Sequence, residues 1–492
     1  MVVLSVVGAL TLSACGGLAD GEVDSGSKTL RIGMTSDAQS LDPPNFVLVG
    51  DFTRDNLLYE GLVRLTKDNK IEPALATEWT EVSPTEWDFT LRKGVTFHDG
   101  TAFDSTAVKK SLERAAKQPQ GKGFLSTIKE VQTPDPMTAR IVLSRPFSAL
   151  INNLSVPVAA IISPKALDEK DAKALAKEPV GTGPYKFVSW IPDTKMTFEA
   201  NPEYWGEKAT LDRVEFIPIP EASTRYSALQ AGDVDVIESP PPDQLEALKS
   251  SPDLQPIIEP KARPIFIGFN LKTVKDPLVR KAVAHAIDRD AIIKNIVGGD
   301  AQPLYTICTP SQVGCTHEGA TVYKYDPALS KKLLAEAGFP NGFEIPIHAY
   351  RERDQTEAMI NYLQAVGIKA KLNFMQYAAM RDQERANKAA LVHWTWGSNL
   401  VNDVSASTPV YFGGGADDTT HDAQVKELLD KGDHTVDAKA RTEYYSKALN
   451  IIADKAYAVP LWSLPVYYVA NKELNFRAYS DELPRFWEMS WK

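Results

Sequence analysis

The chain alternates between strand-like and helix-like segments along nearly its whole length, and this alternation limits the fold more than any other feature. Thr29–Met34 and Trp87–Arg92 alternate apolar and polar residues as strands do, whereas Asp51–Leu65 places apolar residues at helical spacing. In the second half, Pro264–Leu271 is predicted as a strand and Asp276–Val297 as a helix. Alternating strands and helices indicate an α/β fold. With 492 residues the chain exceeds a single hydrophobic core, so at least two lobes are expected.

The composition is that of a soluble globular protein, with 24% charged and 43% hydrophobic residues. The formal net charge of −10 disfavours nucleic acid and anionic membrane surfaces as partners, because both attract basic patches. After the N-terminal region, residues 456–470 come nearest to a membrane-spanning length, but Pro460 and Pro465 interrupt them.

The N-terminus is typical of an exported protein. An apolar run, Val2–Leu12, is followed by Ser13-Ala14-Cys15 and then by a polar stretch of small residues. This pattern resembles the lipobox of bacterial lipoproteins, in which the cysteine carries the lipid. We therefore expect Cys15 to be the lipidated first residue of the mature protein, outside the cytoplasm. No Lys or Arg precedes Cys15, so we expect the true translation start to lie upstream of Met1.

The two remaining cysteines close a short loop rich in turn-forming residues, Cys308–Cys315. In an oxidising compartment this spacing favours a local disulfide, and two free thiols are the alternative. A zinc site would need four ligands, and only His317 lies nearby in the sequence. We predict neither a metal site nor a cofactor.

No enzyme motif is present in a usable form. The sequence has no Gly-x-Ser-x-Gly elbow, no His-Glu-x-x-His and no phosphate-binding Walker loop. Gly181-Thr-Gly183 lacks the third glycine of a dinucleotide loop and indicates a tight turn. Asp417-Asp418 indicates a solvated acidic loop, with a cation site as the alternative. We therefore predict a protein that binds a ligand and is not an enzyme.

An aromatic pair, Trp394 and Trp396, ends one predicted strand and precedes a polar loop, Gly397–Asp403. Aromatic walls with a few polar groups are what a ligand site needs. Alternation along a strand places both tryptophans on one face, so either or both can instead belong to the core of a lobe.

These segments together resemble the family 5 extracellular solute-binding proteins, the peptide, dipeptide and nickel receptors of ABC importers. The most specific stretch is Trp87–Gly100, followed by Phe103-Asp104-Ser105. Further matches follow in the family's order: Gly181–Tyr185, Asn201–Trp205, Ala228–Asp235, Phe269-Asn270, Val279–Val283, Ala286–Arg289 and Pro460–Trp462.

The resemblance implies a two-lobed periplasmic-binding-protein-like fold (type II, cluster C) with an extra subdomain in lobe one. The lobes would be joined by two crossings, with hinges near Arg263–Phe269 and Pro460–Asn471. The expected division is a signal and leash over 1–27, lobe one over 28–45, 163–265 and 466–492, the extra subdomain over 46–162, and lobe two over 266–465.

The resemblance also implies that a solute is captured between two closing lobes and delivered to ABC permease subunits. In peptide-binding relatives an Asp shortly after a Trp in lobe two pairs with the ligand's amine. Here Asn399 holds that position, so Asp403 is the nearest carboxylate. The expected ligand site joins Thr35 and Asp37 of lobe one to Trp394, Trp396, Asn399 and Asp403 of lobe two.

The expected ligand is a short peptide, and the protein is expected to be a monomer held at the membrane only by its lipid. Because a neutral Asn attracts an ammonium less than a carboxylate does, other solutes remain open. These are an opine-like conjugate, an oligosaccharide or a metal chelate, the last supported only by His393. An extracellular hydrolase is a further alternative.

Overall fold

The structure is a computed structural model. It describes residues 28–45, 49–68, 70–118, 121–241, 244–298, 300–396, 401, 403–479 and 481–492. Cys15 and Asn399, both named in the predictions above, lie outside the described residues.

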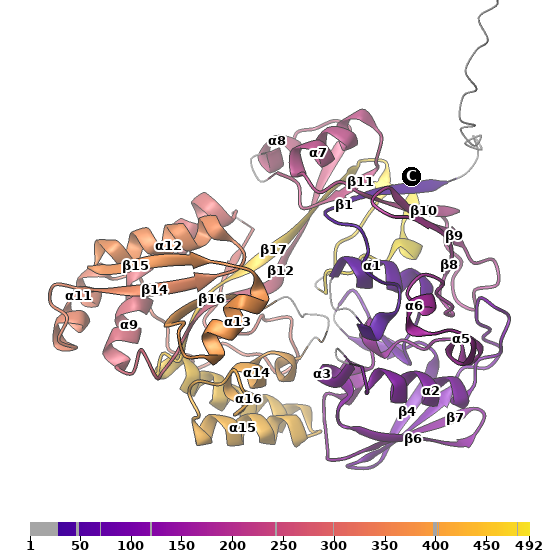
Figure 1. Ribbon diagram of the computed structural model, residues 1–492, viewed down its shortest axis with the longest axis horizontal. Coiled ribbons are helices and arrows are strands. Elements are labelled where there is room, and N and C mark those ends of the chain that lie inside the picture. The colour runs from indigo at the N-terminus through magenta and orange to yellow at the C-terminus, as the bar shows by residue number, and fades with distance from the viewer. Residues whose placement is uncertain are drawn as a thin grey trace, which may run out of the picture.

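One continuous sheet of eleven strands runs through both lobes (Figure 1). Its centre is a long antiparallel pair, β12 (Leu254–Phe269) and β17 (Ala458–Asn471). The lobe one strands are β11 (Val236–Glu238), β1 (Thr29–Met34), β10 (Arg213–Pro218), β9 (Lys195–Ala200) and β8 (Tyr185–Ile191), in that order outward from β17. The lobe two strands are β16 (Leu391–Thr395), β14 (Phe343–Ala349) and β15 (Ile368–Phe374), in that order outward from β12, while β13 (Gln302–Pro303) pairs with β17.

The directions of these strands make the carboxyl ends of the two lobes face each other. β11 is antiparallel to β17 and therefore runs with β12, whereas β16 runs against β12. Lobe one joins the beginning of β12 and lobe two joins its end. The last residue of β11 is level with Ile257, and the last residue of β16 is level with Ile265. An extended strand covers about 25 Å over that span.

The extra subdomain is a separate antiparallel sheet, in the order β4 (Ala76–Ser83), β5 (Glu86–Leu91), β7 (Thr138–Leu143) and β6 (Ile128–Asp135). Helix α2 (Ser105–Ala115) packs on it, with Ala107, Val108 and Leu112 in the shared core. A small hairpin, β2 (Val63–Leu65) and β3 (Ile71–Pro73), connects this sheet to lobe one. The other helices of lobe one and the subdomain are α1 (Val49–Leu58), α3 (Gly121–Leu125), α4 (Leu150–Asn153), α5 (Pro164–Glu169), α6 (Ala172–Leu175), α7 (Ala222–Ala231) and α8 (Leu245–Leu248).

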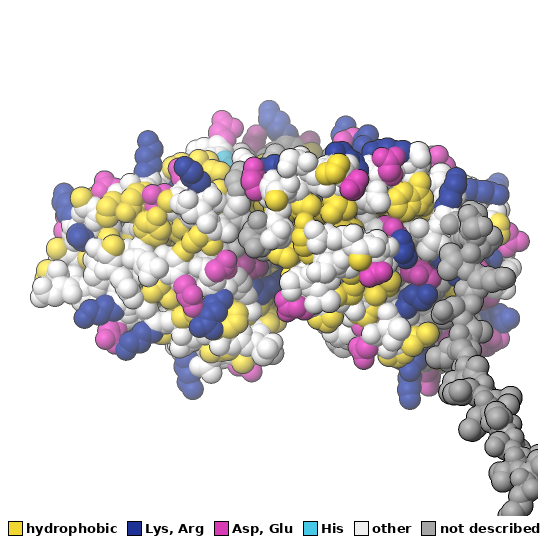
Figure 2. All heavy atoms as spheres, turned by 90° about the horizontal axis from the view of Figure 1, so that it is seen from above, with side chains coloured by type: hydrophobic (Ala, Val, Ile, Leu, Met, Phe, Trp, Pro, Cys, Tyr) yellow, Lys and Arg dark blue, Asp and Glu magenta, His cyan; other side chains and the backbone are white. Residues whose placement is uncertain are grey.

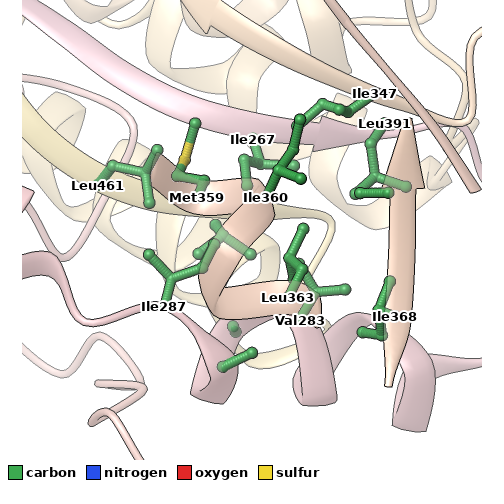
Figure 3. Packing of buried hydrophobic residues seen from close by; sticks show 14 of the residues in the cluster. Ile267, Val283, Ile287, Ile347, Met359, Ile360, Leu363, Ile368, Leu391 and Leu461 are labelled. Atoms are coloured by element: carbon green, nitrogen blue, oxygen red, sulfur yellow. The ribbon is translucent and has the colours of Figure 1, made fainter. Parts of the chain in front are cut away.

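Helices cover both faces of the sheet in lobe two. On one face Ile267 of β12 packs in a cluster with α9 (Pro277–Ala286) and α12 (Arg353–Ala365), where Met359 and Ile360 lie next to it and Val283 and Leu363 continue the cluster (Figure 3). On the other face Phe266 and Trp394 meet α13 (Tyr377–Arg385), α14 (Thr408–Phe412), α15 (Ala423–His434) and α16 (Ala438–Asp454). Helices α10 (Arg289–Ile292) and α11 (Pro327–Glu336) complete the first layer, and β18 (Leu474–Asn475) pairs with β19 (Ser490–Trp491) near the C-terminus.

Several predicted boundaries are corrected. The helix predicted over Asp51–Leu65 ends at Leu58, because the chain turns at Glu60-Gly61 and then forms β2. The helix predicted over Asp276–Val297 breaks after Ala286, where Ile287 takes an extended conformation and Asp288 caps a new helix. The strand predicted from Pro264 begins ten residues earlier, at Leu254.

The extra subdomain and lobe two touch directly. The Ser148 backbone N–H and hydroxyl both donate to the Asp433 carbonyl at 2.8 Å, and the hydroxyl also reaches the Gly432 carbonyl at 3.1 Å. Asn152 donates to the Asp403 carboxylate at 2.8 Å. An apolar cluster adds to this contact and joins Phe52, Val156, Val158, Val401 and Leu483. The two lobes therefore meet at a surface separate from the β12–β17 connection.

The predicted disulfide between Cys308 and Cys315 is confirmed. The residues packed around Phe266 and Trp394 on the other face of the sheet form the second core of lobe two. Cys308 is fully buried in this core, and Cys315 packs against it. The disulfide thus fixes a loop that also pairs Val313 with Asp403.

The described residues contain no helix that is both long and apolar enough to cross a membrane. On the face shown in Figure 2, basic and acidic side chains are interspersed over both lobes.

Candidate ligand-binding site between the lobes

In α/β sheets, ligands bind beyond the carboxyl ends of the parallel strands. In lobe one these ends are those of β1 and β11. Thr35 is exposed, and its backbone N–H and hydroxyl both donate to Glu238 Oε1 at 2.7 Å. Glu238 was not predicted as a site residue, because only the parallel pairing of β1 with β11 places it beside Thr35. Lobe one therefore presents a carboxylate at this edge.

In lobe two the corresponding ends are those of β14 and β16. The Tyr350 hydroxyl donates to the Thr395 carbonyl at 2.7 Å, and the Thr395 hydroxyl donates to Glu352 at 2.8 Å. These bonds tie together the two loops that follow the strands. Arg351 lies between Tyr350 and Glu352 in the loop after β14. Its side chain is 47% exposed, and its Nε lies 3.9 Å from Glu352 Oε1. Lobe two therefore presents a guanidinium in the loop after β14, at the same edge of the sheet as Trp396.

The two tryptophans occupy different environments. Trp394 is 2% exposed, and its ring lies 5.0 Å from that of Tyr411 and under the guanidinium of Arg381. The prediction that Trp394 contacts ligand is not supported, since its ring fills the second core. Trp396 is half-buried at the end of β16, and its indole Nε1 has no hydrogen-bond partner among the described residues. Trp396 therefore remains the aromatic candidate for ligand contact.

Asp37 has a structural role in lobe one. Its Oδ2 accepts hydrogen bonds from the Trp190 indole at 3.0 Å and from the Asp193 backbone at 2.8 Å. Its Oδ1 accepts from the Ala38 backbone at 2.8 Å. These bonds anchor the turn between β8 and β9 to the loop after β1. The predicted ligand contact of Asp37 is not supported, because its carboxylate is already occupied.

Asp403 also has a structural role and not the predicted role in ligand contact. It is fully buried and forms a two-pronged ion pair with Arg441, at 2.6 Å and 2.7 Å. Its oxygens additionally accept hydrogen bonds from the Ser405 backbone and from Asn152. The carboxylate beside it holds the pKa of Arg441 above its ordinary value, against the effect of burial. Asp403 thus has a cation of its own and no free oxygen to offer a ligand amine.

A buried ion pair, Arg54 with Asp51, stabilises the loop after β1. Arg54 donates to the Ser36 carbonyl at 2.8 Å and to the Gly50 carbonyl at 3.0 Å, and Asp51 lies 3.6 Å away. Both side chains are almost completely buried. Burial raises the pKa of Asp51 to about 6. This support keeps Thr35 and Ser36 at the edge of lobe one.

The His393 side chain is buried and does not reach this edge. His393 is 2% exposed, and its Nδ1 lies 2.7 Å from the Thr356 hydroxyl. Burial lowers its pKa to about 3, so the ring is neutral. Within the described ranges, no three His, Cys, Asp or Glu side chains are grouped as metal ligands would be. His393 therefore cannot hold a metal complex between the lobes.

A family model for bacterial extracellular solute-binding proteins, family 5, middle region, matches residues 70–419. The chain belongs to this family. It is 30% identical over 454 residues to the glutathione-binding protein GsiB of Salmonella paratyphi A, covering 88% of this chain and 86% of that protein.

Two solved structures extend the comparison. DppA from Helicobacter pylori, in complex with the peptide STSA, superposes with a TM-score of 0.80 at 27% identity, covering 94% of this chain and 98% of that one. AgaA from A. tumefaciens R10, in complex with agropinic acid, superposes with a TM-score of 0.76 at 29% identity, covering 94% and 99%. The two-lobed family 5 fold and the role of a substrate-binding protein of an ABC importer are therefore confirmed.

We predict that Asp403→Asn destabilises this solute-binding protein by about 3–5 kcal/mol, because it leaves the Arg441 guanidinium buried without its counter-charge. Chemical denaturation of the ligand-free protein measures this loss. Glu357→Gln is the matched control: it breaks the exposed pair with Arg353 and should change stability by less than about 1 kcal/mol. Equal stability of Asp403→Asn and the wild type would contradict the structural role of Asp403.

Proposed function

We propose that the protein captures a short peptide between its two lobes and delivers it to the permease of its ABC importer. The observation that supports this is that the carboxyl ends of the parallel strands in the two lobes face each other. The edge of lobe one carries an acid, Glu238, and the edge of lobe two carries a base, Arg351. A peptide carries an amine and a carboxylate at opposite ends, which matches this separation of charge. Closure of two lobes around a ligand is a known motion of periplasmic receptors.

Each contact has a defined chemistry in this proposal. The ammonium of the peptide meets Glu238, whose position compensates for the neutral Asn399 in lobe two. The peptide carboxylate meets Arg351, since guanidinium–carboxylate pairs form two parallel hydrogen bonds. Trp396 covers an apolar side chain, and Thr35 lines the opposite wall. The backbone N–H and C=O groups of both edges complete the recognition of an extended chain.

Glutathione is the first candidate within this class, because it is a small peptide and the relative GsiB is named for binding it. The complex of DppA with the peptide STSA supports the same class. Agropinic acid, bound by AgaA, keeps open the non-peptide alternative, an opine-like conjugate. A metal chelate is disfavoured by the burial of His393.

We further propose that Cys15 carries the lipid that holds the mature monomer near its permease. The lipobox-like segment before Cys15 supports this, and no other part of the chain is proposed to contact the membrane. Cys15→Ser, expressed with its upstream region, should leave the membrane fraction and lose radioactive palmitate. Retention of both properties by the variant would place the anchor elsewhere.

Arg351→Gln is expected to weaken the binding of a free tripeptide or glutathione at least tenfold, because it removes the cation for the carboxylate. Calorimetry should also show that the wild type prefers a free tripeptide over its C-terminal amide and that the variant does not. Arg353→Gln is the matched control, since Arg353 is exposed on α12 and pairs with Glu357. Equal affinity of the wild type for the free and amidated peptides would refute this role.

Substituting each of the two tryptophans distinguishes a residue that contacts ligand from one that only packs in the core. Trp396→Ala should reduce peptide affinity by about 2–3 kcal/mol with little change in the melting temperature of the ligand-free protein. Trp394→Ala should instead cost about 3–5 kcal/mol of stability, because its ring fills the second core of lobe two. Unchanged affinity in a folded Trp396→Ala protein would remove this residue from the site.

A further inference from the structure

A cavity of about 470 Å³ is lined by residues of lobe one and the extra subdomain. It is bounded by the end of α1, the β2–β3 hairpin and the C-terminal segment 477–488. The described residues that line it come from 55–74, 155–160, Pro184, Tyr204 and 477–488. Since none of these belongs to lobe two, the cavity differs from the site between the lobes. Its volume falls within the range of small-molecule sites.

The inner wall of the cavity holds a buried acid, Asp55, with one oxygen that has no hydrogen-bond partner among the described residues. Asp55 is 2% exposed, and its Oδ1 accepts no hydrogen bond from any described residue. Burial raises the pKa of Asp55 well above its ordinary value; Asp51 and Asp42 add to this effect, and Arg54 opposes it. A buried carboxyl group without donors is costly, so natural proteins rarely retain one without a use.

The other buried charged groups of the wall already have partners. Glu60 accepts hydrogen bonds from Trp205 at 2.7 Å and from Tyr204 at 2.8 Å. Arg485 is held by Asp481 at 2.6 Å. Asp55 is therefore the group of the wall that is available to a bound molecule.

The surface end of the cavity carries both bases and acids, and the acids are Asp68, Glu72 and Glu488. Lys67 and Lys70 on the hairpin and Arg477 on the C-terminal segment are exposed and line the same cavity. None of them forms an ion pair with a described residue. The cavity thus has an acid at its inner end and, at its outer end, three bases without an ion-pair partner among the described residues, beside acids of the same wall.

We propose that this cavity is a second binding site, for a small zwitterion such as a free amino acid. The ammonium group enters and meets the Asp55 carboxylate, whose Oδ1 has no hydrogen-bond donor among the described residues. The carboxylate stays at the outer end and meets Lys67, Lys70 or Arg477. The apolar wall of Val63, Leu65, Ala74, Val156 and Leu483 covers the side chain.

The site is tested by titrating the full-length protein with glycine, leucine, glutamate and lysine in a calorimeter. Acetate and butylamine, each carrying only one of the two charged groups, are the ligand controls. We expect at least one amino acid to bind and neither control to bind. Asp55→Asn should weaken that binding at least tenfold.

Two further variants serve as controls for Asp55→Asn. Asp51→Asn is matched to Asp55→Asn, because Asp51 is also 2% exposed, lies one turn earlier on α1, and has an unpartnered oxygen, yet does not line the cavity. Arg351→Gln alters the site between the lobes. Asp51→Asn should bind the amino acid at least as tightly as the wild type, because it removes a neighbouring acid that raises the pKa of Asp55. Arg351→Gln should bind it as the wild type does.

Three results would overturn the proposal. They are no binding of any of the four amino acids to the wild type, unchanged binding in Asp55→Asn, and loss of binding in Arg351→Gln, which would assign the amino acid to the site between the lobes. If Asp55→Asn gives no cooperative melt, Ala74→Leu replaces it, since Ala74 lines the cavity and a larger side chain there is expected to reduce the space for a ligand. Unchanged binding in that variant would overturn the proposal equally.

Discussion

The pairing of β12 with β17 is the interaction on which the rest of the molecule depends. These two strands form the central pair of the sheet, here called the spine, and each strand contributes one part to lobe one and another part to lobe two. Their antiparallel course makes the parallel strands of the two lobes run toward each other. The register between them shifts from Glu259 to Arg263, and there the buried pair of Arg263 with Glu482 ties the spine to the C-terminal segment. An irregular ladder at this point is suited to bending between the lobes.

The second connection between the halves is polar. Asn152 and Ser148 of the extra subdomain reach Asp403 and the end of α15 in lobe two. Asp403 is held by Arg441, so the acceptor that Asn152 meets has a fixed position. Single hydrogen bonds of this kind contribute about 0.5–1.5 kcal/mol each. Such contacts can form and break during closure, whereas the β12–β17 ladder persists.

The fold could largely be predicted from the sequence, because strand and helix periodicities are local. The strand over Thr29–Met34 has the predicted bounds. The predictions failed where long-range pairing decides the outcome. The first part of β12 contains Pro256 and Pro260 and does not alternate, yet it pairs with β17 as far as Asn471. In α1, the helical spacing continued past Leu58, but the chain left the helix to form a hairpin.

The candidate site was predicted less well, since a residue's role depends on partners far away in the sequence. Trp396 and Thr35 lie at the carboxyl ends of their strands, as expected for site residues. Asp403 could not be recognised as structural, because its counter-ion follows 38 residues later on α16. Asp37 similarly binds a turn more than 150 residues away. Glu238 and Arg351 carry no motif and became candidates only through the topology of the sheet.

The central claim, that the solute is held between the facing carboxyl edges, is tested most directly by a crystal structure with bound glutathione or a tripeptide. The account predicts electron density between Trp396 and Thr35, with the ligand amine at Glu238 and a carboxylate at Arg351. Ligand density at any other place, with none of these four residues in contact with the ligand, would contradict the account.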